Sequence, residues 1–175
     1  MLSWFESRSR SQVKIDSGFE MHMKWKHPPI IKIYEALGSV ADGRVEVSGN
    51  KSKVYSSSGN KFYEVSYDPE NCAIMANDNG SYWKGYLGYP AIAFLFKSGL
   101  LEFRPGMASL LKGIKWKDIN QKYKNDFVKT LQHIEDSLNE EDKEALSTYV
   151  QEVDQKITEL DLSLLGNKTI PPEGY

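Results

Sequence analysis

A dense group of aromatic residues lies in the middle of the chain, beside glycines and one lysine. It consists of Tyr82, Trp83, Lys84, Tyr86 and Tyr89. Aromatic faces with a cation nearby can stack on rings and attract anionic groups. The alternative is that these rings fill the core with their polar atoms turned outward, because aromatic side chains dominate core packing. We take Trp83, Lys84, Tyr86 and Tyr89 as candidate binding residues.

A basic stretch follows between residues 112 and 129, with two aromatic residues inside it. Its candidate binding residues are Lys115, Trp116, Lys117 and Lys122. A basic face of this kind can hold the phosphates of RNA or DNA. Residues 140–161 are acidic, so the alternative is that two neighbouring helices carry complementary, solvated faces.

The residue patterns of known catalytic and phosphate-binding loops are incomplete in this chain. Gly80–Tyr86 lacks the Gly-Lys-Ser/Thr end of a P-loop. The serine run Ser56–Ser58 has no glycine where a nucleophile elbow needs one. An enzyme alternative remains, in which Asp78 works with His27 or Cys72 as a small hydrolase.

Metal ligands are scarce, because the chain has one cysteine and three histidines. A structural zinc site needs about four nitrogen or sulfur ligands at close spacing. A mixed site of His22, His27 and a carboxylate is the one arrangement that these residues leave open. We therefore expect no metal and no cofactor.

Composition narrows the class of protein. Of the 175 residues, 40% are hydrophobic, and the formal net charge is −2, which together favour a globular protein that is not a strongly basic nucleic-acid binder. No apolar run approaches the roughly 18 residues that a membrane-spanning helix needs. Glu6, Arg8 and Arg10 interrupt the apolar start before a secretory signal could form. We expect a cytoplasmic protein with no membrane contact.

The candidate residues have to be positioned by elements that the pattern predicts. A proline pair at Pro28 and Pro29 precedes an amphipathic helix that runs to about Val40. Short strands rich in Val, Tyr and Phe follow, and the turns between them are short enough to make neighbours antiparallel. A buried helix over 90–97 should lie across this sheet. The strands are expected at 44–47, 53–57, 61–67 and 73–76.

Two further patterns frame this core. Apolar residues repeat every three or four positions from Ile119 to Leu138, which predicts one helix of about five turns. Asn139 can cap a second helix, which we expect to end at Gly166, and the two would form an antiparallel hairpin. At the other end of the chain, residues 19–26 alternate between apolar and polar, as a strand does.

The predicted fold class is α+β, an antiparallel meander of three or four strands packed on helices, with a C-terminal antiparallel helical hairpin. The expected parts are an N-terminal basic arm or strand at 1–27, the core at 28–112, the hairpin at 113–165 and a tail at 166–175.

One family resemblance rests on the hairpin and the helix after it. The run Val54–Val65 reads V-Y-S-S-S-G-N-K-F-Y-E-V, and a short strand and Gly88–Leu95 follow it. In layout, residues 52–97 resemble the ββα element of the SWIM domain, in which Cys-x-Cys follows the hairpin and Cys-x-His opens the helix. Here Gly88 and Pro90 stand at the latter positions, and no zinc ligand carries over. The resemblance implies binding to DNA or protein rather than catalysis.

These observations lead to one functional expectation. We expect a non-enzymatic binding or adaptor protein that contacts protein or nucleic acid through the aromatic loop (82–89) and the basic stretch (112–129). A protein partner or self-association is the first expectation, and nucleic acid is the second. The hydrolase with Asp78 is the alternative.

Overall fold

The structure is a computed structural model and describes residues 22–173. Most of the predicted basic arm at 1–27 lies outside the described residues, as do residues 19–21 of the predicted strand at 19–26. Within the described part, Lys24 forms an isolated bridge with Ser163, and Lys26 forms one with Tyr86. The chain therefore enters the fold beside the aromatic loop.

The centre of the fold is a five-stranded sheet with the order β1-β2-β3-β4-β5. The first four strands are an antiparallel meander, as the short turns predict. Val54 and Tyr63 are partners in register and are buried on the inner face, whereas Lys53 and Glu64 are partners on the exposed face. The strands are β1 (Val45–Ser48), β2 (Lys51–Tyr55), β3 (Phe62–Asp68), β4 (Ala73–Ala76) and β5 (Ser163–Leu164).

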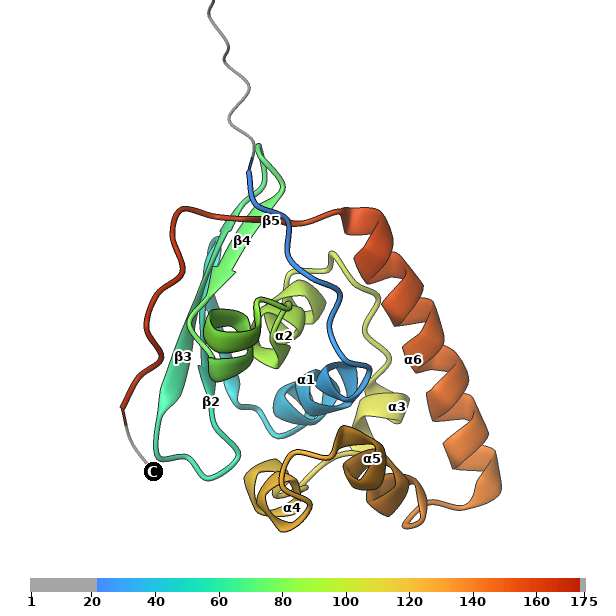
Figure 1. Ribbon diagram of the computed structural model, residues 1–175. Helices are drawn as coiled ribbons and strands as arrows, with labels where there is room; N and C mark the ends of the chain where they lie inside the picture. The colour runs from blue at the N-terminus through green and yellow to red at the C-terminus, as the bar shows by residue number, and fades with distance from the viewer. Residues whose placement is uncertain (1–21, 174–175) are drawn as a thin grey trace, which may run out of the picture.

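The helix α2 (Tyr89–Lys97) packs against the sheet, and α1 (Ile31–Ala41) packs against α2. Pro90 stands in the first turn of α2, and every residue from Pro90 to Phe96 is buried, which confirms the predicted core helix. Figure 1 shows α1 and α2 between the sheet and the long helix α6 (Glu140–Leu160). A short helix, α3 (Pro105–Ser109), packs against α1 and α6.

The predicted continuous helix from Ile119 to Leu138 is wrong. The structure has two helices, α4 (Trp116–Lys122) and α5 (Phe127–Glu135). Between them Lys124 and Asn125 have φ angles of 50° and 61°, a left-handed conformation that no α-helix accepts. The side chain of Asp126 then caps α5 by accepting a hydrogen bond from Lys129 N (3.2 Å). Local polar chemistry thus overrides the apolar repeat.

The beginning of α6 is as predicted, because Asn139 Oδ1 accepts a hydrogen bond from Asp142 N (2.8 Å). Its predicted end at Gly166 is wrong, since α6 ends at Leu160. Asp161 takes a left-handed conformation (φ 47°), and the chain turns into β5, which pairs in parallel with β4. The open edge of β4 accepts this strand. The α+β class, with its meander and C-terminal helices, is confirmed.

Across residues 22–173, none of the helices combines the length and the apolar character that crossing a bilayer requires.

Candidate functional site: a basic pocket lined with aromatic rings

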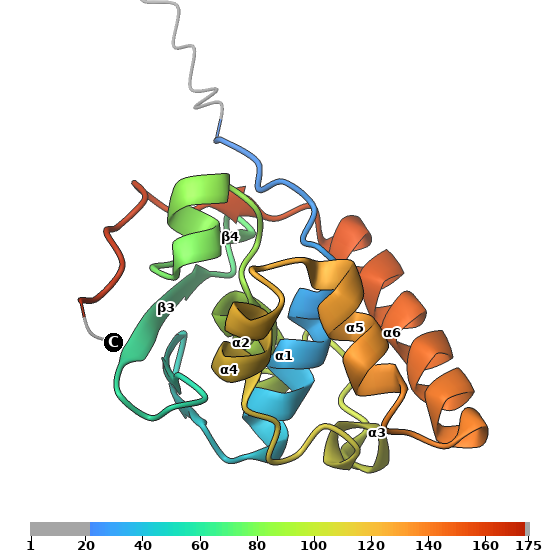
Figure 2. The same ribbon diagram turned by 60° about the horizontal axis from the view of Figure 1, so that its bottom comes forward.

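A pocket of about 770 Å³ lies between the β2–β3 loop, α1, α4 and the loop that follows β4. Of the eight candidate residues from the sequence, six line it: Trp83, Lys84, Tyr86, Tyr89, Trp116 and Lys117. Lys115 and Lys122 are exposed and do not line it. Figure 2 shows β3 and α4 on one side of α1 and the helix α6 on the other side. Tertiary structure therefore joins two surfaces that are separate in the sequence.

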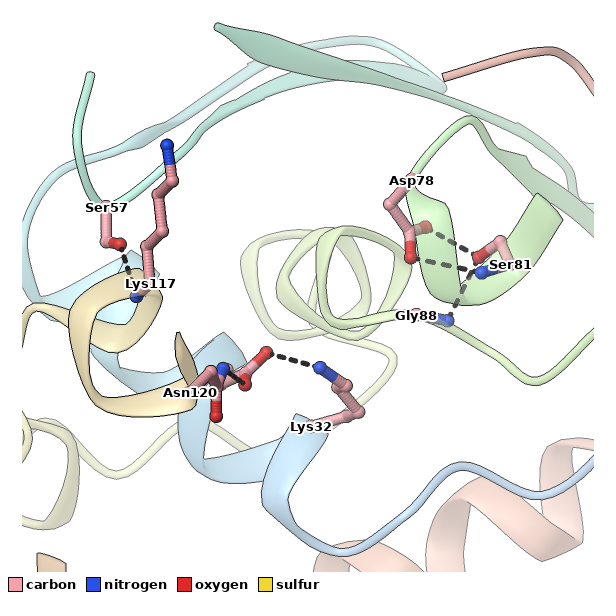
Figure 3. A network of polar contacts seen from close by, with 8 residues as sticks. Lys32, Ser57, Asp78, Ser81, Gly88, Lys117 and Asn120 are labelled. Atoms are coloured by element: carbon pink, nitrogen blue, oxygen red, sulfur yellow. Dashed lines mark hydrogen bonds and ion pairs between the residues drawn. The ribbon is translucent and has the colours of Figure 1, made fainter. Parts of the chain in front are cut away.

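The first part of the aromatic loop lies in a π-helix, η1 (Gly80–Lys84), which is held by one buried carboxyl group. Asp78 accepts hydrogen bonds from the backbone N of Ser81 (3.1 Å) and from its hydroxyl (2.6 Å). The Ser81 hydroxyl oxygen in turn accepts a hydrogen bond from Gly88 N (3.2 Å), which ties both ends of the loop together (Figure 3). Turns of π-helix are rare and concentrate at functional sites.

Two glycines allow the backbone of this loop to approach neighbouring side chains closely. A β-carbon on Gly88 would overlap the Asp78 carboxylate, and one on Gly80 would overlap the Tyr86 ring. Asp78 is consequently buried, and burial raises the pKa of its carboxyl group, although the hydrogen bonds from Ser81 oppose that rise. The loop is a fixed platform rather than a loose connection.

The four aromatic residues of the loop have different environments. Trp83 is 70% exposed, and its ring meets that of Tyr82 edge to face at 4.6 Å. Tyr86 and Tyr89 are partly buried, and Tyr89 packs edge to face against Tyr63 at 6.0 Å. Burial raises the pKa of Tyr89 well above its ordinary value and that of Tyr63 to about 12. The tyrosines therefore stay neutral donors, while Trp83 offers an open ring at the rim.

A buried ion pair lies at the base of the pocket. Lys32 Nζ is 2.9 Å from Glu35 Oε2, and Asn120 Nδ2 donates a hydrogen bond to Glu35 Oε1 (2.8 Å; Figure 3). Lys32 Nζ also lies 4.8 Å from the centre of the Phe127 ring. Burial alone would lower the pKa of Lys32, but Glu35, Tyr86 and Asp78 raise it above its ordinary value. Lys32 is therefore a protonated cation inside the pocket.

The opposite wall comes from the β2–β3 loop and the start of α4. Lys117 N donates a hydrogen bond to Ser57 Oγ (3.2 Å), which fixes α4 against the loop (Figure 3). The pKa of Lys61 is lowered by partial burial and by the charge of Lys117. Two basic side chains therefore share this wall of the pocket.

Arg44 is a further cation of the lining. Its Nη1 donates to Tyr55 O (2.6 Å) and its Nε to Asp42 Oδ2 (3.2 Å). Its Nη2 is buried and has no hydrogen-bond partner within residues 22–173. The carbonyl oxygen Oδ1 of Asn120 is in the same condition. A buried donor and a buried acceptor without partners cost about 1–3 kcal/mol each, which a polar ligand could recover.

The structure does not bring the proposed hydrolase residues together. His27 Nε2 pairs with Asp154 Oδ1 (2.6 Å), and Cys72 Sγ lies 3.4 Å from Leu160 O. Neither residue lines the pocket with Asp78. Within residues 22–173, no three His, Cys, Asp or Glu side chains gather in a way that could hold a metal ion.

Sequence reasoning missed the residues that the rest of the fold brings to the pocket. Lys32 and Glu35 have little signal, because they lie three positions apart on the polar face of α1, where exposed ion pairs also occur. Arg44 and Lys61 have none, because only the packing of the hairpin against α4 places them there. The acidic face of α6 pairs elsewhere, with Lys24, His27 and Arg104.

Comparison with known proteins gives one result. Neither a curated protein nor a solved structure matches the chain. Residues 25–163 match the family described as "Uncharacterised conserved protein UCP014422", and this stretch includes the whole pocket lining. The match says nothing about a SWIM-like element, which stays a prediction. The chain belongs to this conserved family.

Proposed function

We propose that the protein is a non-enzymatic binding protein whose pocket takes an organic anion that carries a ring. The observation that supports this most directly is the convergence of the aromatic loop and the start of the basic stretch on one pocket. Its volume of about 770 Å³ lies in the range of small-molecule sites, about 300–1,000 Å³. A small ligand, or one end of a larger one, therefore matches this volume better than a long stretch of nucleic acid does.

The charge of the pocket lining supports the proposal that the ligand is an anion. Five basic side chains stand against two carboxyl groups, Glu35 and Asp78. Glu35 is engaged by Lys32 at 2.9 Å, and Asp78 is engaged by Ser81. Lys61 and Lys117 place two of these positive charges on one wall of the pocket.

The same contacts argue against catalysis as the main role. The hydroxyl of Ser81 donates to Asp78 and accepts from Gly88, so both groups are used to hold the loop. A general acid or base needs a free approach to a substrate proton. We therefore prefer the role of a binding protein over that of a hydrolase. A protein partner, self-association and a cytoplasmic location stay predictions.

The test is a titration followed by tryptophan fluorescence, because Trp83 and Trp116 both line the pocket. The probes are adenosine monophosphate, pyrophosphate and glucuronate, each at low and at high salt. We expect at least one of them to bind, and to bind more weakly at high salt, since exposed charges are screened.

A matched pair of variants supplies the control. Lys117→Glu places a negative charge in the lining, whereas Lys122→Glu makes the same change on the same helix outside the pocket. We expect about tenfold or greater loss of affinity for the first variant and none for the second. Absence of salt-dependent binding for all three probes would refute the proposed function, as would equal effects of the two variants.

A further inference from the structure

The two sides of the pocket differ in chemistry. The side formed by the β2–β3 loop and α4 carries hydroxyl groups and cations, among them Ser57, Lys61 and Lys117. The side formed by η1 carries the exposed ring of Trp83 beside one cation, Lys84, whereas the ring on the α4 side, Trp116, is buried. Figure 3 shows Ser57 and Lys117 well apart from the Asp78–Ser81–Gly88 contacts that anchor the η1 side. A ligand that satisfies both sides has to be bipartite.

The cationic side fits a phosphoryl group. Lys61 and Lys117 line the same wall of the pocket, and partial burial together with the charge of Lys117 lowers the pKa of Lys61. Arg44, whose Nη2 is a buried donor without a partner in the described chain, lines the same pocket. Three cations of this kind with neighbouring serine hydroxyls match a group that has several acceptor oxygens and more than one negative charge.

The ring side fits a nucleobase. The T-shaped contact with Tyr82 (4.6 Å, 90°) supports the Trp83 ring from its neighbour and leaves most of its surface open. The loop itself is fixed by the Asp78–Ser81–Gly88 hydrogen bonds, so little ordering is needed when a ring binds. Stacking on such a platform tolerates any flat heterocycle.

We propose that the ligand of this pocket is a nucleoside phosphate, with the phosphate at Arg44, Lys61 and Lys117 and the base against Trp83. This inference rests on the proposed function and narrows it to one ligand class. A free nucleotide and the terminal nucleotide of a nucleic acid share this chemistry, and both fit a pocket of this volume.

The experiment compares four probes on the full chain by isothermal titration calorimetry: adenosine monophosphate, adenosine, ribose 5-phosphate and pyrophosphate. We expect adenosine monophosphate to bind most tightly. Removal of the base should weaken binding roughly 5- to 150-fold, the equivalent of one stacked ring at about 1–3 kcal/mol. Removal of the phosphate should weaken binding and abolish its salt dependence.

Two variants separate the subsites. Trp83→Ala should reduce the affinity for adenosine monophosphate and leave that for ribose 5-phosphate unchanged. Lys117→Ala should reduce the affinity for adenosine monophosphate and leave that for adenosine unchanged. Trp83 is exposed and Lys117 is at the surface of the pocket, so both variants should keep the fold, which circular dichroism verifies.

The outcomes distinguish the two proposals. If ribose 5-phosphate or pyrophosphate binds as tightly as adenosine monophosphate, the nucleoside assignment is overturned while the binding of anions stands. If no probe binds with salt dependence, the proposed function itself fails. A 5′-phosphorylated oligoadenylate identifies the source of the nucleoside phosphate. An affinity equal to that for adenosine monophosphate indicates a free nucleotide, and a higher affinity indicates the end of a nucleic acid. Both results support a nucleoside phosphate as the ligand.

Discussion

Replacing Gly88 by alanine tests whether the aromatic loop depends on the close approach of backbone to a buried carboxyl group. Gly88 has φ −76° and ψ 165°, an extended conformation that alanine adopts without strain. Any effect of the substitution therefore comes from the new methyl group. That group would overlap the carboxylate of Asp78, which is fully enclosed and bonded to Ser81.

The expected magnitude follows from these contacts. Forcing an extra methyl group into a packed site costs about 1–3 kcal/mol. Displacing Asp78 also lengthens its hydrogen bonds to Ser81, each worth about 1.5–3 kcal/mol if the carboxyl group is ionised. Because both losses are partial, we expect Gly88→Ala to lower the free energy of unfolding by about 3 kcal/mol. For a chain of this size, that lowers Tm by about 6–12 °C.

The assay is urea denaturation followed by tryptophan fluorescence, in a double-mutant cycle with Asp78→Ala. Removing the carboxyl group makes room for the methyl group, so the two substitutions should couple by about 1–3 kcal/mol. Gly106→Ala in α3 is the matched control, because no atom lies within 4 Å of its added β-carbon. We expect this control to be neutral or to stabilise by up to about 1 kcal/mol.

Two results would refute this reasoning. One is a Gly88→Ala variant whose free energy of unfolding lies within about 0.5 kcal/mol of the parent protein, the usual range for substitutions that disturb nothing. The other is a double variant whose loss equals the sum of the single losses, since contact predicts coupling.

Two further predictions concern buried charge. Burial raises the pKa of Asp78 above its ordinary 3.8, so the folded chain holds this proton more tightly than the unfolded chain does. The contribution of Asp78 to the free energy of unfolding therefore falls as the pH rises from about 3.8 through the folded-state pKa. Asp78→Asn should therefore gain stability relative to the parent over this range in denaturation curves, and a pH-independent difference would contradict the assignment. Lys32→Met leaves Glu35 buried without its cation and should lower the free energy of unfolding by about 3–5 kcal/mol. The double variant Lys32→Met, Glu35→Leu should recover most of this loss in the same assay. A double variant that is no more stable than the single one would contradict the role of the ion pair.

Local chemistry explains why several elements could be predicted. Pro90 presets the first turn of α2, and Asn139 supplies an acceptor to the first turn of α6. The meander follows from turn residues between short strands, which leave no length for a parallel return. In each case the determining residues lie within a few positions of the element that they define.

The elements that were predicted wrongly depend on residues that are distant in the sequence or on a local change of backbone conformation. The apolar repeat from Ile119 onward correctly marks residues that face the core, but it cannot reveal that Lys124 and Asn125 leave the helical conformation between two such faces. The two residues of β5 carry no strand pattern of their own, and they form a strand because the edge of β4 lies where α6 ends. Strand pairing of this kind is a tertiary event.

For the candidate site, the residue types can be predicted from the sequence: a glycine-spaced aromatic loop and a basic stretch with Trp116 and Lys117 near its start. That both belong to one pocket, that Lys32 and Arg44 complete it, and that Lys115 and Lys122 stay outside follows from the packing of the whole fold. The pocket draws on residues 32–127, and their proximity depends on how the hairpin, α1 and α4 pack around a shared core. No local pattern encodes such distances.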